Sequence, residues 1–273
     1  MKKTKCVYPL IVLCAFLFTA CGESVQTDYV VLVGEDAGIV DRISDTDILV
    51  VDGDYFTSED VTQLKDNGVK KVYTYFNIGS LESYRDYYES YAQYALGDYE
   101  NWPEEQWADI SSNEWQSLLR DRAEAMMQKG FDGFFVDNTD VYYVYPYEEI
   151  YDGIVDVLQA LYGLDKDVII NGGDCFVKRY LESEENPIQI FEGVNQENVY
   201  TGYDFEKENF EINSDEARTY YEEYLDFVMQ KGYKVFTVEY AKDKQTKKSA
   251  CSYAKKHKYR CYVSDNIELK MNK

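Results

Sequence analysis

The chain has 273 residues, 45% of them hydrophobic, and a formal net charge of −23. Its apolar content is high enough to bury a core, whereas its charge would repel phosphates, so we expect no nucleic-acid partner. The single histidine and the absence of a CxxC pair argue against zinc sites, and neither a GxGxxG motif nor a P-loop marks a nucleotide site. We therefore expect a protein that works without a metal or another cofactor.

The first residues of the chain indicate export. Three lysines precede an apolar run from Val7 to Ala20, which is too short to span the ~30 Å of membrane hydrocarbon but suits a signal-peptide core. Residues 17–22 resemble the cleavage box of bacterial lipoproteins, so residues 1–20 form the expected signal peptide and Cys21 the expected lipidation site. Residues 21–27 would then link the protein to the outer face of the cell membrane. Ordinary secretion after cleavage near Ala20 is the alternative.

Three cysteines remain after this processing, namely Cys175, Cys251 and Cys261. An odd number does not give a complete disulfide framework. A bridge between Cys251 and Cys261 is one interpretation for an oxidising compartment, and buried free thiols are the interpretation that we favour.

Residues 28–273 are expected to form one domain, because no linker-like stretch divides them. Strand-like runs alternate with helix-like ones, such as a helix predicted over residues 113–129. Most strand-like runs are continuously apolar, which is typical of parallel strands covered on both faces. This pattern predicts an α/β fold, a single (β/α)8 TIM-type barrel, with a doubly wound open sheet as the alternative. The eight expected strands are Ile48–Asp52, Lys71–Asn77, Trp107–Ile110, Phe131–Asp137, Asp167–Asn171, Gly193–Glu197, Lys234–Glu239 and Tyr259–Asp265.

Carboxylates stand at the C-terminal ends of six of these predicted strands, where barrel enzymes assemble their active sites. Two such acids are sufficient for glycoside hydrolysis without a metal. A Ser-His-Asp hydrolase is disfavoured, because no GxSxG motif is present and His257 is the only histidine. The six acids are Asp52, Asp109, Asp137, Glu197, Glu239 and Asp265.

The chain is also rich in tyrosine, with 28 residues of this type. Tyrosine combines an aromatic face with a polar hydroxyl, and both suit the apolar faces and hydroxyls of sugar rings. Many of these side chains must simply pack helices against strands. The run from Tyr142 to Tyr147 directly follows a strand-end acid, so we expect this run to face a ligand.

Five segments resemble, in order, motifs of the endo-α-1,4-polygalactosaminidases, glycoside hydrolase family 114. The most specific segment, residues 130–142, contains Asp-Gly-Phe-Phe-Val-Asp-Asn-Thr-Asp and is similar to the family's Asp-Gly-x-x-x-Asp-Asn-x-Asp. Residues 102–110, Trp-Pro-Glu-Glu-Gln-Trp-Ala-Asp-Ile, resemble its Trp-Pro-x-Glu-x-Trp-x-Asp-Ile. The other three segments are residues 75–85, 191–197 and 235–240, and the resemblance extends over residues 28–265.

The resemblance implies a (β/α)8 barrel that hydrolyses internal bonds of a partly N-acetylated α-1,4-galactosamine polymer without a cofactor. It places the two catalytic acids on Asp137 and Glu197. Because Asp137 is short and ends a rigid strand, we expect it to be the nucleophile, and the longer Glu197 to be the general acid/base of a retaining mechanism. The expected substrate-binding residues are Asp52, Tyr75, Glu82, Arg85, Asp109, Asn138, Asp140, Asn171, Glu239 and Tyr240.

Two other interpretations of the sequence stay open. The protein could be a surface lipoprotein that binds polysaccharide on a barrel without catalysis, or a hydrolase of another α-linked sugar. In each case the expected partner is a polysaccharide, and a cationic galactosamine polymer suits the negative charge of the chain. We expect the protein to act as a monomer.

Overall fold

The computed structural model describes residues 28–183 and 187–272. The predicted signal peptide, the predicted lipidation site at Cys21 and the predicted linker of residues 21–27 lie outside the described residues. Within the described ranges, no helix is both long enough and apolar enough to cross a membrane.

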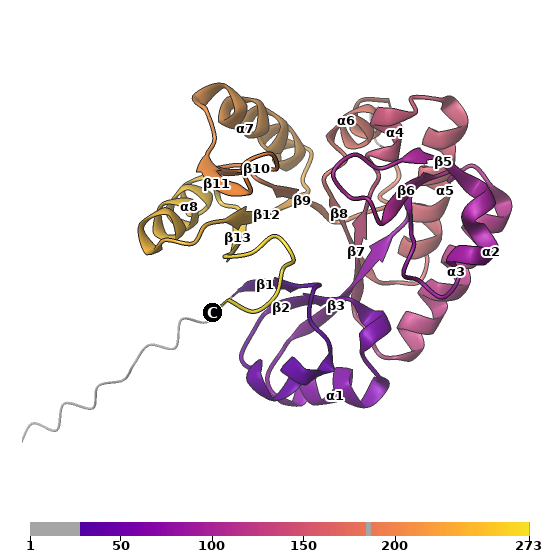
Figure 1. Cartoon of the computed structure of the whole chain (residues 1–273), viewed down its shortest axis with the longest axis horizontal. Coiled ribbons are helices and arrows are strands. Elements are labelled where there is room, and N and C mark those ends of the chain that lie inside the picture. Colours follow the sequence, from indigo (N-terminus) through magenta and orange to yellow (C-terminus); the bar gives the residue numbers. More distant parts are fainter. Residues whose placement is uncertain (1–27, 184–186, 273) are drawn as a thin grey trace, which may run out of the picture.

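Eight parallel strands form one sheet that curls into a nearly closed barrel, with helices on its outer side (Figure 1). Seven of the strand-to-strand contacts are parallel ladders, so the chain returns to the same end of the barrel after every strand. The predicted TIM-type barrel is confirmed, and the open sheet is excluded. The barrel strands are β1 (Tyr29–Leu32), β2 (Ile48–Val51), β3 (Lys71–Asn77), β7 (Gly133–Asp137), β8 (Asp167–Asn171), β9 (Gly193–Glu197), β12 (Lys234–Tyr240) and β13 (Arg260–Ser264).

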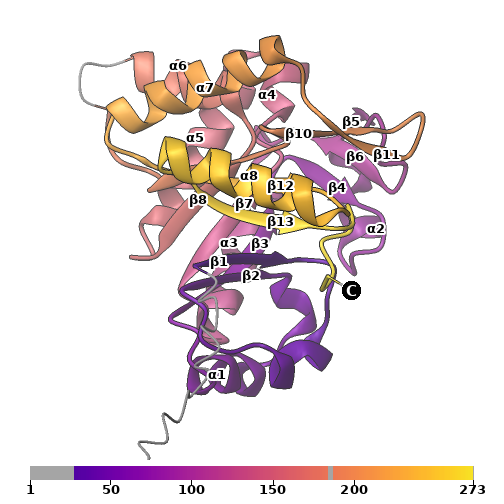
Figure 2. The same cartoon turned by 90° about the vertical axis from the view of Figure 1, so that its left-hand side faces the viewer.

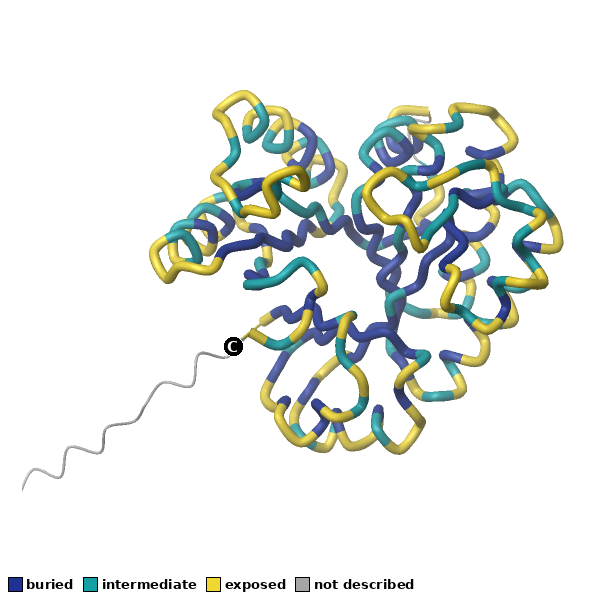
Figure 3. The backbone as a smooth tube through the Cα atoms, viewed as in Figure 1, coloured by how far each residue is buried: buried dark blue, intermediate teal, exposed yellow. Residues whose placement is uncertain are grey.

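The strands of the barrel are buried almost throughout, whereas the helices expose their outer faces (Figure 3). Some helices begin at capping residues; Ser112, for example, accepts a hydrogen bond from the backbone N–H of Trp115 and starts α3, which confirms the helix predicted over residues 113–129. The α-helices are α1 (Ser58–Asp66), α2 (Tyr88–Tyr91), α3 (Asn113–Gln128), α4 (Val141–Val144), α5 (Glu148–Tyr162), α6 (Asp174–Ser183), α7 (Asp215–Gln230) and α8 (Lys244–His257). Three short 3-10 helices are η1 (Ala37–Arg42), η2 (Gly53–Tyr55) and η3 (Ala92–Tyr94).

The structure corrects the strand prediction in two places. The first barrel strand, β1, was not predicted, because its four residues directly follow the expected linker. The predicted barrel strand Trp107–Ile110 is wrong: this segment belongs to β6 (Glu105–Ala108) and the loop after it, and β6 pairs antiparallel with β4 (Ser80–Glu82) and β5 (Ala95–Asp98) in a separate small sheet. One barrel strand was missed and one was predicted in excess before β7, so the numbering of the later strands is unchanged. As predicted, β7 and β9 are the fourth and sixth strands of the barrel.

Two insertions extend from the C-terminal ends of the barrel strands. The small sheet β4–β6–β5 follows β3, and a hairpin of β10 (Thr201–Asp204) and β11 (Asn209–Ile212) follows β9. Both lie on the same side of the molecule (Figure 2). They meet through Trp102 and Phe205, whose ring centroids are 6.3 Å apart. The C-terminal end of the barrel is therefore covered from two directions.

A segment near the C-terminus fills the gap between β1 and β13, the two ends of the hydrogen-bonded order (Figure 1). The backbone N–H of Gly34 donates to the carbonyl oxygen of Leu269 (3.3 Å), and the N–H of Met271 donates to the Glu35 carboxylate (2.9 Å). A Cβ at Gly34 would lie 1.9 Å from the carbonyl oxygen of Glu268, so the close approach of the two segments requires glycine.

Candidate active site

A cleft of about 500 Å³ lies at the C-terminal end of the barrel, a volume that is typical of ligand sites. Aromatic side chains from β3, both insertions and β12 form part of its wall. Among the described residues that line it, none is a lysine, arginine or histidine. The seven carboxyl groups that line the cleft belong to Asp52, Glu82, Glu105, Asp137, Asp140, Glu197 and Glu268.

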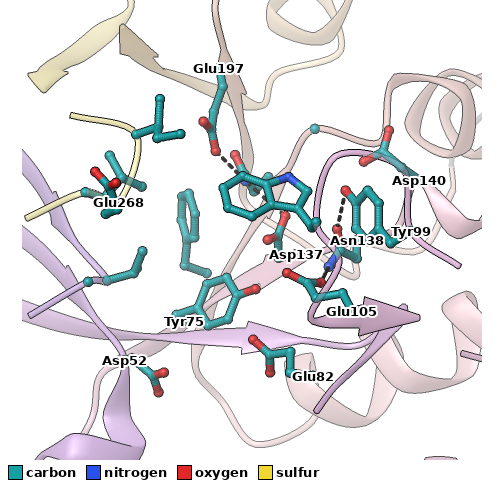
Figure 4. Close-up of a pocket in the computed structure, with 18 of the residues that line it drawn as sticks. Asp52, Tyr75, Glu82, Tyr99, Glu105, Asp137, Asn138, Asp140, Glu197 and Glu268 are labelled. Carbon is teal, nitrogen blue, oxygen red and sulfur yellow. Dashed lines mark hydrogen bonds between the residues drawn. The ribbon is translucent and has the colours of Figure 1, made fainter. Parts of the chain in front are cut away.

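Asp137 and Glu197 end strands β7 and β9 and point toward one another in Figure 4. Asn171 ends β8, the strand between them, and its Nδ2 donates to both Asp137 Oδ1 (3.0 Å) and Glu197 Oε1 (2.9 Å). Because both oxygens bond to one nitrogen, these two oxygens lie no more than about 6 Å apart. The geometry therefore brings together two acids at a distance that spans a single glycosidic bond.

The chain leaves each of these three strands through a left-handed turn. Asn138 follows Asp137 with φ 65°, Gly172 follows Asn171 with φ 68°, and Asn198 follows Glu197 with φ 57°. Asparagine and glycine are the residues that adopt this conformation most readily. The turns bend the chain away at once, so the last side chain of each strand stays at the mouth of the barrel.

The titration of Asp137 is perturbed. Burial, together with the carboxylates of Glu197 and Glu105, raises the pKa of Asp137 to about 8, although hydrogen bonds from Asn171 and Tyr75 oppose this rise. A nearby negative charge disfavours the charged form of a carboxyl group. Asp137 therefore keeps its proton to a higher pH than an ordinary aspartate does.

Glu105 is a third carboxylate near the pair, and the sequence analysis missed it. It comes from β6, where its Oε2 accepts hydrogen bonds from the Ser80 hydroxyl and from Asn138 Nδ2 (3.3 Å). Asn138 in turn accepts from the Tyr99 hydroxyl (3.1 Å). Burial raises the pKa of Glu105. Its position in the Trp-Pro-x-Glu motif is a usable signal, but the sequence analysis considered only Asp109, in the predicted strand Trp107–Ile110, as the acid of this segment.

Asp52 and Glu82 form an acidic wall of the cleft, and an arginine that does not line the cleft compensates their charge. The guanidinium of Arg85 contacts Asp52 (2.9 Å), Glu82 (2.7 Å) and Asp54 (2.6 Å). Arg85 is itself buried and does not line the cleft, so it positions the wall carboxylates and does not face a ligand. Burial raises the pKa of Asp52 even though Arg85 opposes this rise.

Asp140, Tyr75 and Tyr240 line the cleft, as does Asn171. The Tyr240 hydroxyl donates to the Glu197 carboxylate. Asp140 accepts a hydrogen bond from the N–H of Gly173 (3.0 Å), and burial raises its pKa to about 6. Of the ten predicted substrate-binding residues, the cleft thus contains Asp52, Tyr75, Glu82, Asn138, Asp140, Asn171 and Tyr240.

The structure places the other two predicted substrate-binding acids away from the cleft. Glu239 is buried on the face of β12 opposite to Tyr240, because successive side chains of a strand alternate between its faces. It accepts hydrogen bonds from the N–H groups of Tyr200 (3.0 Å) and Thr201 (2.8 Å), so it holds the start of the β10–β11 hairpin. Asp109 lies outside the barrel sheet and accepts from the N–H of Ser111 (3.1 Å) in the turn before α3.

The tyrosine run also differs from its prediction. Residues 142–147 form α4 and the loop after it and do not line the cleft; Tyr143 and Tyr147 are 70% and 58% exposed. The cleft takes its aromatic side chains from other elements. These are Tyr75, Tyr84, Tyr99, Trp102, Phe135, Tyr203, Phe205 and Tyr240. Most lie on the two insertions, whose folding the sequence did not reveal.

The described part of the chain contains no group of three or more histidine, cysteine, aspartate or glutamate side chains arranged to hold a metal ion. Cys175, Cys251 and Cys261 are free thiols in this structure.

An eight-stranded parallel barrel with two facing carboxyl groups at its C-terminal mouth has the fold and site of a barrel glycoside hydrolase. The chain belongs to glycoside-hydrolase family GH114, whose family model matches residues 22–270, and it is a glycoside hydrolase. The predicted resemblance is thereby confirmed.

Two solved structures are similar to the chain over most of its length. The glycoside hydrolase domain of PelA from Pseudomonas aeruginosa matches with a TM-score of 0.76 and 16% identity, covering 90% of this chain and 96% of that one. Ega3 of Aspergillus fumigatus, solved in complex with galactosamine, matches with a TM-score of 0.68 and 18% identity, covering 90% and 93%. At these identities the similarity shows the fold. Among curated protein sequences, none matches the chain.

The raised pKa of Asp137 leads to a stability prediction. A carboxyl group whose pKa is higher in the folded than in the unfolded protein loses folding stability as the pH rises between the two values, here from about 4 to about 8. Asp137→Asn should remove this loss and raise Tm at pH 9 by several degrees, since each kcal/mol corresponds to about 2–4 °C for a domain of this size. Thermal unfolding from pH 5 to pH 9 measures it.

Asp167→Asn is the matched control at the opposite end of the barrel. Burial alone would raise the pKa of Asp167, but hydrogen bonds from Lys71 and Tyr73 hold it below its ordinary value. This control should lower Tm at neutral pH. A Tm of Asp137→Asn that follows the wild type at every pH would contradict the prediction.

Proposed function

We propose that this glycoside hydrolase cleaves internal α-1,4 bonds of a partly deacetylated galactosamine polysaccharide. The observation that carries the proposal is the composition of the cleft, which has seven carboxyl groups and, among its described lining residues, no cationic side chain. A polymer with free amino groups carries ammonium charges, and a cleft of one sign attracts the opposite charge. The similarity to Ega3, a protein solved with galactosamine, supports the same class of substrate.

A cationic side chain compensates the negative charge on one side of the cleft but not near Asp137. Asp52 and Glu82 already share the guanidinium of Arg85. Glu105 accepts only neutral donors, the Ser80 hydroxyl and the Asn138 amide, and it lies close enough to raise the pKa of Asp137. A cation bound beside Glu105 would stabilise both carboxylates. The uncompensated charge is thus concentrated next to the reacting pair.

We propose a retaining mechanism for this reaction. Asp137 attacks the anomeric carbon while Glu197 gives its proton to the leaving oxygen, and Glu197 then takes a proton from the water that breaks the glycosyl–enzyme bond. The shared hydrogen bond from Asn171, which keeps the nearest oxygens of the two acids within about 6 Å, supports the short carboxyl separation of ~5–5.5 Å that retention requires. The roles require the single proton of the pair to reside on Glu197 in the substrate complex, where the positive charge that develops on the sugar stabilises the Asp137 carboxylate.

We also propose that the protein is exported, is anchored to the outer face of the membrane through a lipid on Cys21 and acts as a monomer. The lysines, the short apolar run and the residues around Cys21 support export and lipidation.

Hydrolysis of a defined polymer tests the proposed reaction. Partly deacetylated α-1,4-galactosamine polymer should release reducing ends, whereas chitosan and α-galactan should not. Asp137→Asn should abolish turnover, and Glu197→Gln should retain activity mainly on substrates with good leaving groups, which need no proton in the first step. NMR of the first product should show a retained anomeric configuration. An inverted product, or near-wild-type hydrolysis by Asp137→Asn, would refute the mechanism.

Glu105 offers a test of charge recognition. Glu105→Gln keeps the shape and the hydrogen bonds of the side chain but removes its charge. We expect kcat/KM to fall about 10-fold or more on the highly deacetylated polymer, corresponding to at least ~1.4 kcal/mol, and to fall much less on the acetylated polymer. Equal losses on both polymers would show that Glu105 does not recognise the ammonium group.

Lipidation is tested by Cys21→Ala. This variant should be released from the membrane fraction or keep its signal peptide, and radiolabelled fatty acid should enter the wild type only. Failure of the wild type to incorporate the label would refute the anchor and leave ordinary secretion.

A further inference from the structure

A chain of polar side chains crosses the interior of the barrel beneath the catalytic pair. Tyr29 of β1 is 1% exposed, Asn195 of β9 is 0% exposed and Asn171 of β8 is 8% exposed. The Tyr29 ring packs against Phe236 of the apolar core, with centroids 5.0 Å apart. Burying a polar group without a partner destabilises the fold, so polar side chains at such positions need hydrogen bonds that satisfy them.

The hydrogen bonds of this chain run in one direction. The Tyr29 hydroxyl donates to Asn195 Oδ1 (3.1 Å). Asn195 Nδ2 donates to Asn171 Oδ1 (2.6 Å), and Asn171 Nδ2 donates to Asp137 and Glu197. Burial and the carboxylate of Glu197 keep the pKa of Tyr29 well above its ordinary value, so its hydroxyl retains the proton that it donates.

This direction determines which end of each amide faces the carboxyl groups. An asparagine side chain has one acceptor end and one donor end. In the structure the Tyr29 hydroxyl donates to Oδ1 of Asn195, so the NH2 group of Asn195 faces Asn171. Oδ1 of Asn171 accepts this hydrogen bond, and its NH2 group faces the pair. Because the Tyr29 hydroxyl finds an acceptor only in this orientation of Asn195, its hydrogen bond favours it. In the opposite orientation, Asn171 would turn a carbonyl oxygen toward two carboxyl groups, which repel it when ionised.

We propose that Tyr29 and Asn195 are positioning residues for glycoside hydrolysis, which orient the Asn171 amide so that its NH2 group bridges Asp137 and Glu197. Their hydrogen bonds reach the two acids through Asn171. The proposal rests on the catalytic roles given to the two acids above. It assigns a function to β1, the barrel strand farthest in sequence from the motifs that carry the chemistry.

The orientation of Asn171 should influence the pH dependence of the reaction. A donor to a carboxylate stabilises the charged form, so a disordered or reversed amide should raise the pKa values of the pair. Both limbs of the profile of kcat/KM against pH should then move to higher pH. Other titratable groups also face the pair, and the variants described below leave them unchanged. They are Tyr75 of β3, Tyr99, Glu105 of β6, Asp140 and Tyr240 of β12.

The test compares Tyr29→Phe with wild type over pH 4–10 on the galactosamine polymer. Tyr29→Phe removes only the hydroxyl. We expect its profile to shift upward by about 0.5–1 pH unit and its kcat at neutral pH to fall several-fold with little change in KM. Asn195→Leu should give the same shift. The double variant should add little to Asn195→Leu, because both residues act through one chain of hydrogen bonds.

Tyr73→Phe is the matched control. Tyr73 is also a buried barrel tyrosine, but its hydroxyl donates to Asp167 at the opposite end of the strands. It should lower Tm by an amount comparable to Tyr29→Phe and leave the pH profile unchanged. If Tyr29→Phe lowers Tm but keeps the wild-type profile and kcat, the role of Tyr29 is only structural and the proposal is overturned.

A second measurement separates this proposal from the choice of substrate. NMR titration of the Asp137 carboxyl carbon needs no turnover, and its apparent pKa should be higher in folded Tyr29→Phe than in wild type. That shift would support the proposal even if wild type does not cleave the polymer. An unchanged apparent pKa in a folded Tyr29→Phe protein would overturn it.

Discussion

One side-chain amide, that of Asn171, bridges the carboxyl groups of Asp137 and Glu197. Two carboxyl groups inside a protein repel one another and lose hydration, so they stay close only when donors compensate them. Asn171 provides such a donor to both acids with a single NH2 group. This contact requires β7, β8 and β9 to be adjacent and to end at the same level, which the parallel barrel achieves. It also requires the backbone to turn away directly after the last residue of each strand. The left-handed turns after these strands meet that requirement.

The negative charge of the cleft is organised by its partners and does not simply reflect an acidic chain. Arg85 compensates the wall formed by Asp52 and Glu82, which fixes their positions. Near the reacting pair, by contrast, the donors are neutral amides and hydroxyls, and they hold carboxylates without cancelling their charge. The carboxylates near the pair are therefore held without a cationic partner among the lining residues of the cleft that the structure describes. Carboxylates thus have two different environments in one cleft: an arginine compensates those of the wall, whereas only neutral donors hold those near Asp137 and Glu197.

The sequence was sufficient to predict the barrel and six strand-end acids, because continuous apolar runs that stop at a carboxylate are a local signal. The choice of Asp137 and Glu197 among the six came from the family resemblance. The sequence could not show which face of a strand a residue occupies near its end, so Glu239 was placed in the cleft although its neighbour Tyr240 occupies that position. Asp109 followed a short apolar run that pairs with strands outside the barrel. The roles of Tyr29 and Asn195 depend on contacts between distant segments, which no local pattern encodes.

The segment that fills the gap between β1 and β13 has a consequence for the order of folding. Met271 and Glu35, which contact each other there, are 236 positions apart, so this contact closes one of the longest loops in the chain. Contacts of such separation form late, because the entropy of closing the loop is lost before the contact is gained. Ile267, Glu268 and Leu269 also line the cleft. A partly folded chain can thus have all of its catalytic strands and still lack one wall of its substrate site.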